Sequence, residues 1–193
     1  MSGAKPRTPE RRGVLLLLAA IALLPLAAAY GLYFFWRPSK LTNYGELLAP
    51  TSLADTVVRQ ADGSTFDFAS LRGKWVLLMV DSGKCDAFCQ AKLYRMRQVR
   101  LTQGESMQRI ECAWLIDDDS APSARLLAEY AGTQQIRAQG SALLKRLPAQ
   151  GSARAHIYVV DPLGNLILRY AGDADATGMK KDITRLLKVS RIG

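Results

Sequence analysis

The sequence predicts an α/β domain, with a central mixed sheet flanked by helices, behind a single N-terminal transmembrane helix. Three observations predict this arrangement. The first is an apolar stretch from Val14 to Trp36 that carries no formal charge. The second is the apolar run Trp75 to Val80, which is typical of a strand buried on both faces. The third is the alternation of strand and helix patterns after this run, which favours parallel strands joined by crossover helices.

The apolar stretch at 14–36 is long enough, at about 1.5 Å per residue, to cross a bilayer core of about 30 Å. Basic residues are denser before this stretch than after it, so the positive-inside rule places the N-terminus in the cytoplasm. A cleaved signal peptide is the alternative, because the alanines at 27–29 resemble the end of a cleavage site. Aromatic residues continue the run to Trp36, as in an uncleaved anchor with an interfacial belt.

Four regions are therefore expected along the chain. They are a basic cytoplasmic tail at 1–13, a transmembrane anchor at 14–36, a tether at 37–54 and an extracytoplasmic domain at 55–193. The tether is expected because its residues show little periodicity and include two prolines. The net charge of +9 suits an anionic membrane or an acidic partner. No basic stripe interleaved with aromatic residues is present, so we expect no nucleic-acid partner.

Each element of the domain is predicted by its own pattern. Residues 57–68 predict a hairpin that turns at Asp62 and Gly63 before the buried strand at 75–80. A helix from about Asp86 to Thr102 is expected to carry a solvated basic side, formed by Lys92, Arg95, Arg97 and Arg100. Later patterns predict a strand at 110–116, helices at 123–130 and 141–147, a hairpin with strands at 156–160 and 166–170, and an amphipathic helix at 177–188. The order βαβ followed by ββα is the thioredoxin arrangement.

Cys85 and Cys89 stand four residues apart, where the buried strand gives way to the first helix of the domain. Residues i and i+4 share a helix face, so the two sulfur atoms can close a disulfide or bind one soft metal ion. A helix N-terminus also stabilises thiolate over thiol. The pair is predicted to be redox-active or copper-binding, with a purely structural disulfide as the alternative. Cys112 lies in a strand pattern and is expected to be a buried core residue.

Residues 57–190 resemble the Sco (SenC) proteins of the thioredoxin-like superfamily. The resemblance lies in the C-x3-C spacing of the cysteines, in the strand and acidic turn from Leu115 to Asp119, and in the late hairpin from Tyr158 to Gly164. Sco proteins are anchored in a membrane outside the cytoplasm and assist assembly of the binuclear copper centre of cytochrome c oxidase. They bind copper through two cysteines and one histidine. This chain is similar to a divergent Sco-like subgroup.

The resemblance implies that Cys85 and Cys89 act as copper ligands or as thiol-exchange residues, with His156 as a third copper ligand. His156 is the only histidine, and it lies three positions after the place, near Ala153, where the family carries its own. A histidine that begins a strand is also common as an edge residue without a metal. The acids at 117–119 are expected to form a solvated turn and helix cap rather than a cation site.

By resemblance, the protein is expected in the bacterial inner membrane, with one span and a periplasmic C-terminal domain. Its expected role is to assist cytochrome c oxidase biogenesis by copper delivery or thiol redox control, with an oxidase subunit or another assembly factor as partner. One alternative is a general periplasmic thiol-disulfide oxidoreductase, which would make it an enzyme. The strand at 156–160 lacks the preceding proline of oxidoreductase thioredoxins, which weighs against this alternative. The other alternative is a non-catalytic assembly scaffold.

Overall fold

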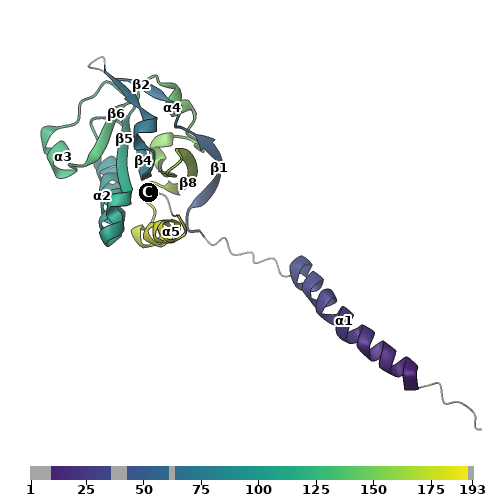
Figure 1. Ribbon diagram of the computed structural model, residues 1–193. Helices are drawn as coiled ribbons and strands as arrows, with labels where there is room; N and C mark the ends of the chain where they lie inside the picture. The colour runs from purple at the N-terminus through teal and green to yellow at the C-terminus, as the bar shows by residue number, and fades with distance from the viewer. Residues whose placement is uncertain (1–9, 36–42, 61–63, 191–193) are drawn as a thin grey trace, which may run out of the picture. The chain divides into compact units, whose positions relative to one another are not determined.

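The computed structural model describes residues 10–35, 43–60 and 64–190 (Figure 1). The chain divides into two compact units, residues 1–42 and 43–193. The first contains a single helix, α1 (Glu10–Phe35). Its segment Gly13–Phe34 is long and apolar enough to cross a membrane, and none of it is buried. The helix is thus a candidate membrane span, whereas most of the predicted basic tail and Trp36 lie outside the described residues.

The second unit is built on a six-stranded mixed sheet in the order β1-β8-β7-β4-β5-β6. The strands are β1 (Glu46–Ser52), β4 (Trp75–Asp81), β5 (Ile110–Ile116), β6 (Thr133–Arg137), β7 (His156–Val160) and β8 (Asn165–Ala171). Strands β4, β5 and β6 are parallel, while β7 runs antiparallel to β4 and β8, and β8 runs antiparallel to β1. The predicted βαβ and ββα units of a thioredoxin-like fold are confirmed.

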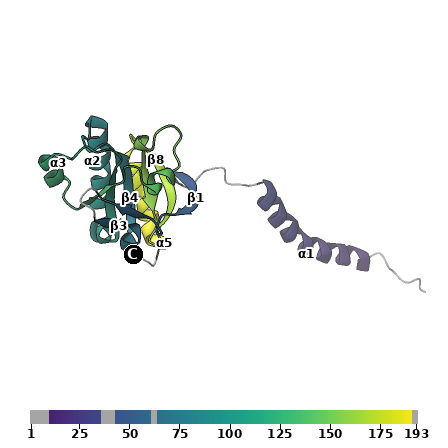
Figure 2. The same cartoon turned by 90° about the horizontal axis from the view of Figure 1, so that it is seen from above.

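Helices cover both faces of the sheet (Figures 1 and 2). One face packs against α2 (Ala87–Leu101), α3 (Ala124–Glu129) and α5 (Ala176–Val189). The other face packs against η1 (Phe68–Leu71), α4 (Ala142–Lys145) and the hairpin of β2 (Val57–Arg59) and β3 (Thr65–Asp67). Two further 3-10 turns, η2 (Gly104–Arg109) and η3 (Ala153–Ala155), precede β5 and β7.

The core consists of two apolar clusters, one on each face of β4. Successive side chains of a strand point to opposite faces, so Leu77 and Met79 join the cluster under α2 and α5, while Leu78 and Val80 join the other. All seven residues of β4 are buried, as its apolar run predicts. This burial fixes the C-terminal end of β4, and therefore the loop that leads to Cys85.

Two of the strands were not predicted from the sequence. The tether expected at 37–54 is wrong from Glu46 onward, because residues 46–52 form β1 and pair with β8. Likewise, β6 joins the sheet beside β5. Both are edge strands with mostly exposed or partly exposed side chains, so neither has the apolar alternation that marks a half-buried strand. The pairing of β2 with β3 is confirmed, whereas the predicted turn at Asp62 and Gly63 lies outside the described residues.

The start of the domain is bonded to α5. The buried carboxylate of Asp182 accepts hydrogen bonds from the backbone N–H groups of Tyr44 (2.9 Å) and Gly45 (2.9 Å). The ring of Tyr44 lies against Gly178, where a Cβ atom would come within 2.6 Å of it. The residues that lead into β1 are therefore held along the last helix of the chain.

Candidate functional site

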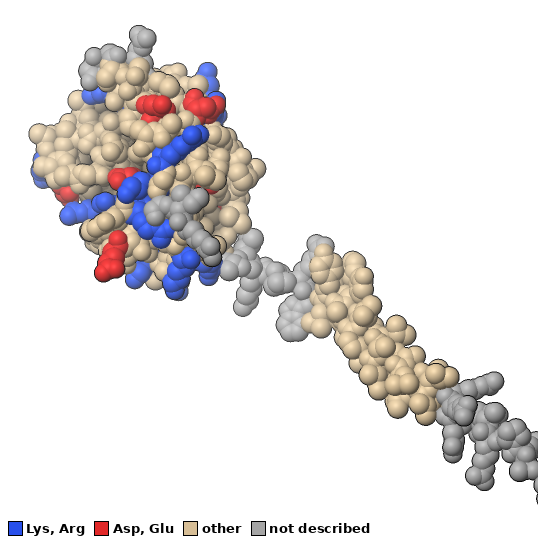
Figure 3. All heavy atoms as spheres, viewed as in Figure 1, with Lys and Arg blue, Asp and Glu red and all other residues tan. Residues whose placement is uncertain are grey.

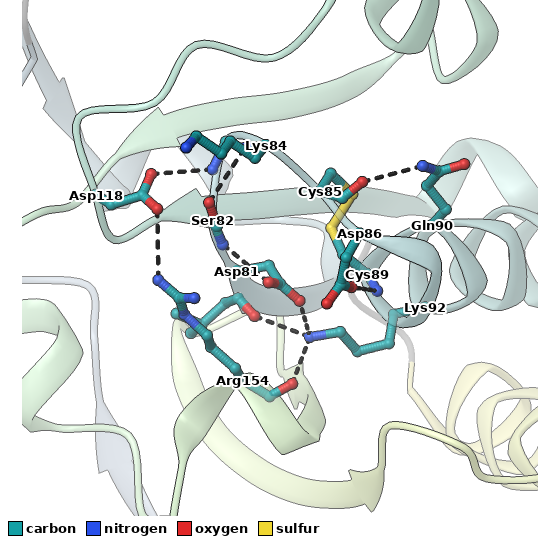
Figure 4. Close-up of a disulfide and its surroundings, with 12 residues drawn as sticks. Asp81, Ser82, Lys84, Cys85, Asp86, Cys89, Gln90, Lys92, Asp118 and Arg154 are labelled. Carbon is teal, nitrogen blue, oxygen red and sulfur yellow. Dashed lines mark hydrogen bonds and ion pairs between the residues drawn. A yellow bond between two sulfur atoms is a disulfide. The ribbon is translucent and has the colours of Figure 1, made fainter.

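Cys85 and Cys89 form a disulfide at the N-terminus of α2 (Figure 4). Their Cα atoms are 5.0 Å apart. Asp86 is the N-cap of α2, and its carboxylate accepts a hydrogen bond of 2.9 Å from the backbone N–H of Cys89. Of the two arrangements that the spacing allows, a disulfide or a shared metal ion, the structure has the disulfide.

The backbone at Cys85 is in the left-handed region, with φ of +42°. Among the described residues it is the one non-glycine residue with positive φ. Its N–H donates to the carbonyl of Ser82 (3.0 Å), and its own carbonyl accepts from the side-chain amide of Gln90 (3.0 Å). Non-glycine residues with strained backbones gather at functional sites, where the surrounding contacts hold them in place.

Reduction of the disulfide is expected to lower the free energy of unfolding by only about 1 kcal/mol. In the chain-entropy description, a cross-link that closes a five-residue loop contributes about 2 kcal/mol. We expect reduction to release the left-handed backbone of Cys85, and this relaxation offsets about 1 kcal/mol of the loss. Urea unfolding with and without dithiothreitol tests this, with a Cys85→Ala/Cys89→Ala variant as the control. A loss above about 3 kcal/mol would identify a structural cross-link instead.

Both cysteines are buried in this oxidised form, since Cys85 is 2% and Cys89 0% exposed. Phe88, between them, is 43% exposed, and its ring lies against Gly172, where a Cβ atom would come within 2.6 Å of the ring. A thiolate or metal ion therefore reaches the sulfur atoms only when neighbouring side chains move. The exposed part of Phe88 offers an apolar contact beside the disulfide.

The loop between β4 and the disulfide is held by the acidic turn that follows β5. The carboxylate of Asp118 accepts from the backbone N–H groups of Gly83 and Ser120, each at 3.1 Å. A hydrogen bond from the Ser82 hydroxyl is the largest cause of the lowered pKa of Asp118. Asp117 forms a bidentate ion pair with Arg154, at 2.7 and 2.8 Å. Asp117 and Asp118 therefore help to hold the loop that leads to the disulfide. The sequence predicted only a solvated turn at these positions.

Lys92 is buried, which corrects the prediction that it lies on the solvated side of its helix. Its side chain is 0% exposed and forms an ion pair with Asp81, the last residue of β4, at 2.7 Å (Figure 4). The ammonium group also donates to the backbone carbonyls of Val80 and Arg154. Burial lowers the pKa of Lys92, and the hydrogen bond to Asp81 opposes this shift. One cation thus joins β4, α2 and η3 one helical turn beyond Cys89.

The sequence does contain a signal for this buried pair. Lys92 lies three residues after Cys89 and four before Met96, so it falls on the apolar stripe of α2. Asp81 directly follows six apolar residues of β4. A base on an apolar stripe and an acid at the end of a buried strand predict a buried ion pair when the two elements pack together.

His156 is not brought together with the two cysteines. It begins β7 on the same face as Tyr158, whose ring centroid is 6.0 Å away. Its neighbour Ile157 points to the opposite face, into the cluster that contains Cys85 and Cys89. His156 lines a cavity of about 330 Å³ with Glu46, Gln150 and Arg169, among others. Among the residues that the structure describes, no three His, Cys, Asp or Glu side chains are placed to hold a metal ion.

His156→Leu is expected to reduce the loss of stability on acidification. Burial, together with the positive charge of Arg169, lowers the pKa of His156. As pH falls below about 6.5, the unfolded chain binds the proton first, so the stabilisation present above that pH is lost through the folded-state pKa. The slope from one such group is at most about 1.4 kcal/mol per pH unit. Equal losses between pH 7.5 and 5.0 in urea unfolding of both proteins would contradict this expectation.

Cys112 is a buried core residue, as the sequence predicts. It is a free thiol on β5, and burial raises its pKa to about 12. A thiol with such a pKa stays protonated at neutral pH and is a poor nucleophile and a poor metal ligand. The thiol chemistry of the described residues therefore centres on Cys85 and Cys89.

Comparisons with known proteins agree with this fold. Residues 75–190 match the sequence profile of a family described as "Transmembrane-like, thioredoxin-like, C-terminal domain". Comparison with curated protein sequences gave no match. The apo Sco1 protein of Thermus thermophilus superposes with a TM-score of 0.56 at 17% identity, covering 78% of this chain and 98% of that chain.

Two further structures show the same similarity. Yeast Sco1 with copper bound gives a TM-score of 0.54 at 16% identity, covering 74% of this chain and 92% of that chain. A putative electron transfer protein from Aquifex aeolicus VF5 gives 0.55 at 16% identity, covering 72% of this chain and 97% of that chain. At these sequence identities, the superpositions show a common fold. The chain therefore belongs to the transmembrane-like, thioredoxin-like C-terminal domain family, and it shares the fold of the Sco1 structures.

Proposed function

We propose that this protein is a membrane-tethered, Sco-like thiol-disulfide protein that assists cytochrome c oxidase biogenesis. The observation that carries the proposal is the disulfide between Cys85 and Cys89 at the N-terminus of α2, directly after the central strand β4. In the proposed role, these cysteines alternate between a disulfide and a dithiol. They thereby control the redox state of two cysteines in a partner protein, such as an oxidase subunit or another assembly factor.

The exchange is balanced in two steps. In the reduced protein, one cysteine thiolate attacks the partner's disulfide and forms a mixed disulfide, releasing one partner thiolate. The second cysteine then attacks the mixed disulfide, so that Cys85 and Cys89 become oxidised and the partner gains two electrons and, from solvent, two protons. The amides at the start of α2 favour the thiolate form that this attack requires.

Copper delivery is the second candidate function, favoured by the yeast Sco1 fold relative that contains copper. After reduction, Cys85 and Cys89 are two soft thiolate ligands close enough to share a Cu(I) ion. His156 is the proposed third ligand by resemblance, although its side chain lies on the other face of β7. That placement favours a Cu(I) site formed by the two thiolates alone.

The location we propose is the bacterial inner membrane, with α1 as a single anchor and the domain in the periplasm. The support is the length and apolar character of Gly13–Phe34, together with the basic residues before it. Thiols in that compartment are oxidised by dedicated proteins, so a reversible dithiol has a use there.

Single-cysteine variants test the proposed exchange. We expect the reduced full-length protein to reduce one equivalent of an oxidised two-cysteine peptide. Of Cys85→Ser and Cys89→Ser, one is expected to trap the mixed disulfide with the peptide, and the other to be inert. Mass spectrometry after acid quenching separates the species, and Cys112→Ser is the matched control with unchanged activity. An inert wild-type protein would overturn the exchange mechanism.

Two measurements separate the remaining alternatives. Cu(I) titration against a chromophoric chelator is expected to show one ion bound per reduced chain, lost in both single-cysteine variants. Unchanged affinity in His156→Ala would remove that residue from the ligand set. If cells assemble oxidase fully with both cysteine variants, each tested separately, the protein is a non-catalytic scaffold. The segment before β7 is the turn η3, without a proline, which weighs against a general oxidoreductase.

A further inference from the structure

The two faces of α5 differ sharply in chemistry. The inner face packs on the sheet through Met179, Asp182, Ile183 and Leu187. The outer face lines a surface hollow of about 520 Å³ with Thr177, Lys180, Lys181, Thr184, Arg185 and Lys188. Their spacing of i, i+3, i+4, i+7, i+8 and i+11 places all six on one side of the helix. Lys and Arg side chains gather on this side of the domain (Figure 3). We call these six residues the basic face of α5.

None of the six residues of the basic face is itself acidic. Asp182 is the one acidic residue within α5, and it is buried, where it accepts hydrogen bonds from Tyr44 and Gly45. Asp175 precedes the helix as its N-cap and accepts from the N–H of Gly178. Four basic side chains and two threonine hydroxyls therefore surround one hollow. This combination of point charges and hydroxyl donors suits phosphate oxygens.

The residues that directly precede β1 are hydrogen-bonded to the same helix, α5. Tyr44 and Gly45 donate to Asp182, and Tyr44 also contacts Gly178. Only seven residues, 36–42, separate the end of α1 at Phe35 from Asn43. A chain of that length reaches at most about 30 Å. A membrane crossed by α1 would therefore stay within reach of the basic face.

We propose that the basic face of α5 binds anionic phospholipid headgroups of the membrane that α1 spans, and so orients the domain on that membrane. This inference rests on the proposed anchor and is independent of the cysteine chemistry. Each basic residue near an anionic surface strengthens binding by about five-fold. Because a short tether keeps the domain at a high effective concentration near the bilayer, weak contacts of this kind suffice.

Amine footprinting of the full-length protein in nanodiscs tests the proposal. Discs are made of phosphatidylcholine alone or of equal parts phosphatidylcholine and phosphatidylglycerol, and a water-soluble acylating reagent is followed by mass spectrometry. In the anionic discs at low salt, Lys180, Lys181 and Lys188 are expected to react at least about five-fold more slowly than in neutral discs. The protection is expected to vanish at 0.5 M NaCl, because salt screens surface charges. Lys145, exposed on α4, is the internal control and should react equally in both.

Each other outcome has a definite meaning. Equal reactivity of the α5 lysines in both kinds of disc overturns the proposal, and protection that appears only after an acidic protein is added identifies a protein partner instead. If the chain fails to co-elute with either disc, the anchor and the docking are both overturned. The thiol-exchange assay stays unaffected, so failure of the proposed redox function is seen separately.

A charge-matched pair of variants gives a second measurement. The domain is released from the full-length protein by a protease site placed within 37–42, and its binding to phosphatidylglycerol vesicles is measured by sedimentation. Lys180→Gln/Lys181→Gln/Lys188→Gln is expected to weaken binding by about 100-fold. Arg72→Gln/Arg125→Gln/Lys145→Gln removes the same charge from exposed sites elsewhere and should change it by less than about five-fold. Equal losses in the two variants would show a general charge effect and overturn the assignment to α5.

Discussion

Lys92→Met is expected to lower the free energy of unfolding by about 3–5 kcal/mol, because it leaves the Asp81 carboxylate buried without its cation. The Lys92 side chain is fully buried, and Asp81 is 2.7 Å from its ammonium group. The same substitution removes the hydrogen bonds to Val80 and Arg154, so the carbonyl groups at the end of β4 and in η3 also lose a donor. Urea unfolding at pH 7 measures the loss.

The double variant Asp81→Leu/Lys92→Met is the control for this prediction. It replaces both charges by apolar groups, so it is expected to recover most of the stability lost in Lys92→Met. The position of the pair, one turn after Cys89, also predicts that Lys92→Met slows thiol exchange with the two-cysteine peptide. A loss of stability below about 1 kcal/mol in Lys92→Met would show that the buried pair contributes little.

Gly83→Ala is expected to lower the free energy of unfolding by about 2–3 kcal/mol. This is the second largest loss expected for a single substitution, after that of Lys92→Met. A Cβ atom on Gly83 would lie 1.9 Å from the carbonyl oxygen of Ser120, a backbone atom that cannot rotate away. The loop before Cys85 and the acidic turn after β5 would have to separate, which would also weaken the hydrogen bond from Gly83 to Asp118. The midpoint temperature of thermal unfolding and the rate of thiol exchange are both expected to fall.

Gly104→Ala provides the comparison. Gly104 has φ of +60° and no neighbouring atom within 4 Å of an added Cβ. Its substitution therefore carries only the backbone cost of about 1 kcal/mol. If Gly83→Ala proves no more destabilising than Gly104→Ala, the close approach of the two loops does not constrain the site.

The sequence was sufficient for the elements that carry their own pattern. The run Trp75–Val80, the strand Ile110–Ile116 and the helix that follows Cys85 were predicted close to their observed bounds because burial alone dictates their periodicity. The edge strands β1 and β6 were missed. Their side chains are largely exposed, and only the hydrogen bonds of β8 and β5 make them strands. Pairing of this kind has no local signal in the chain.

The functional site was likewise predictable only in part from the sequence. Spacing alone placed Cys85 and Cys89 within reach of each other, because a separation of four residues is local. The helix turn expected for the pair is wrong at Cys85, which precedes the N-cap of α2 and has a left-handed backbone. The sequence by itself thus determined the apolar N-terminal helix, the order of the elements and the neighbouring thiols. The apolar stripe of α2 marks Lys92 for burial, but only the packing of α2 on β4 decided that it pairs with Asp81. Tertiary structure alone decided that His156 lies on the other face of β7 from the disulfide. The physical reason is that burial of a charge and the face of a strand depend on which distant segments pack against them.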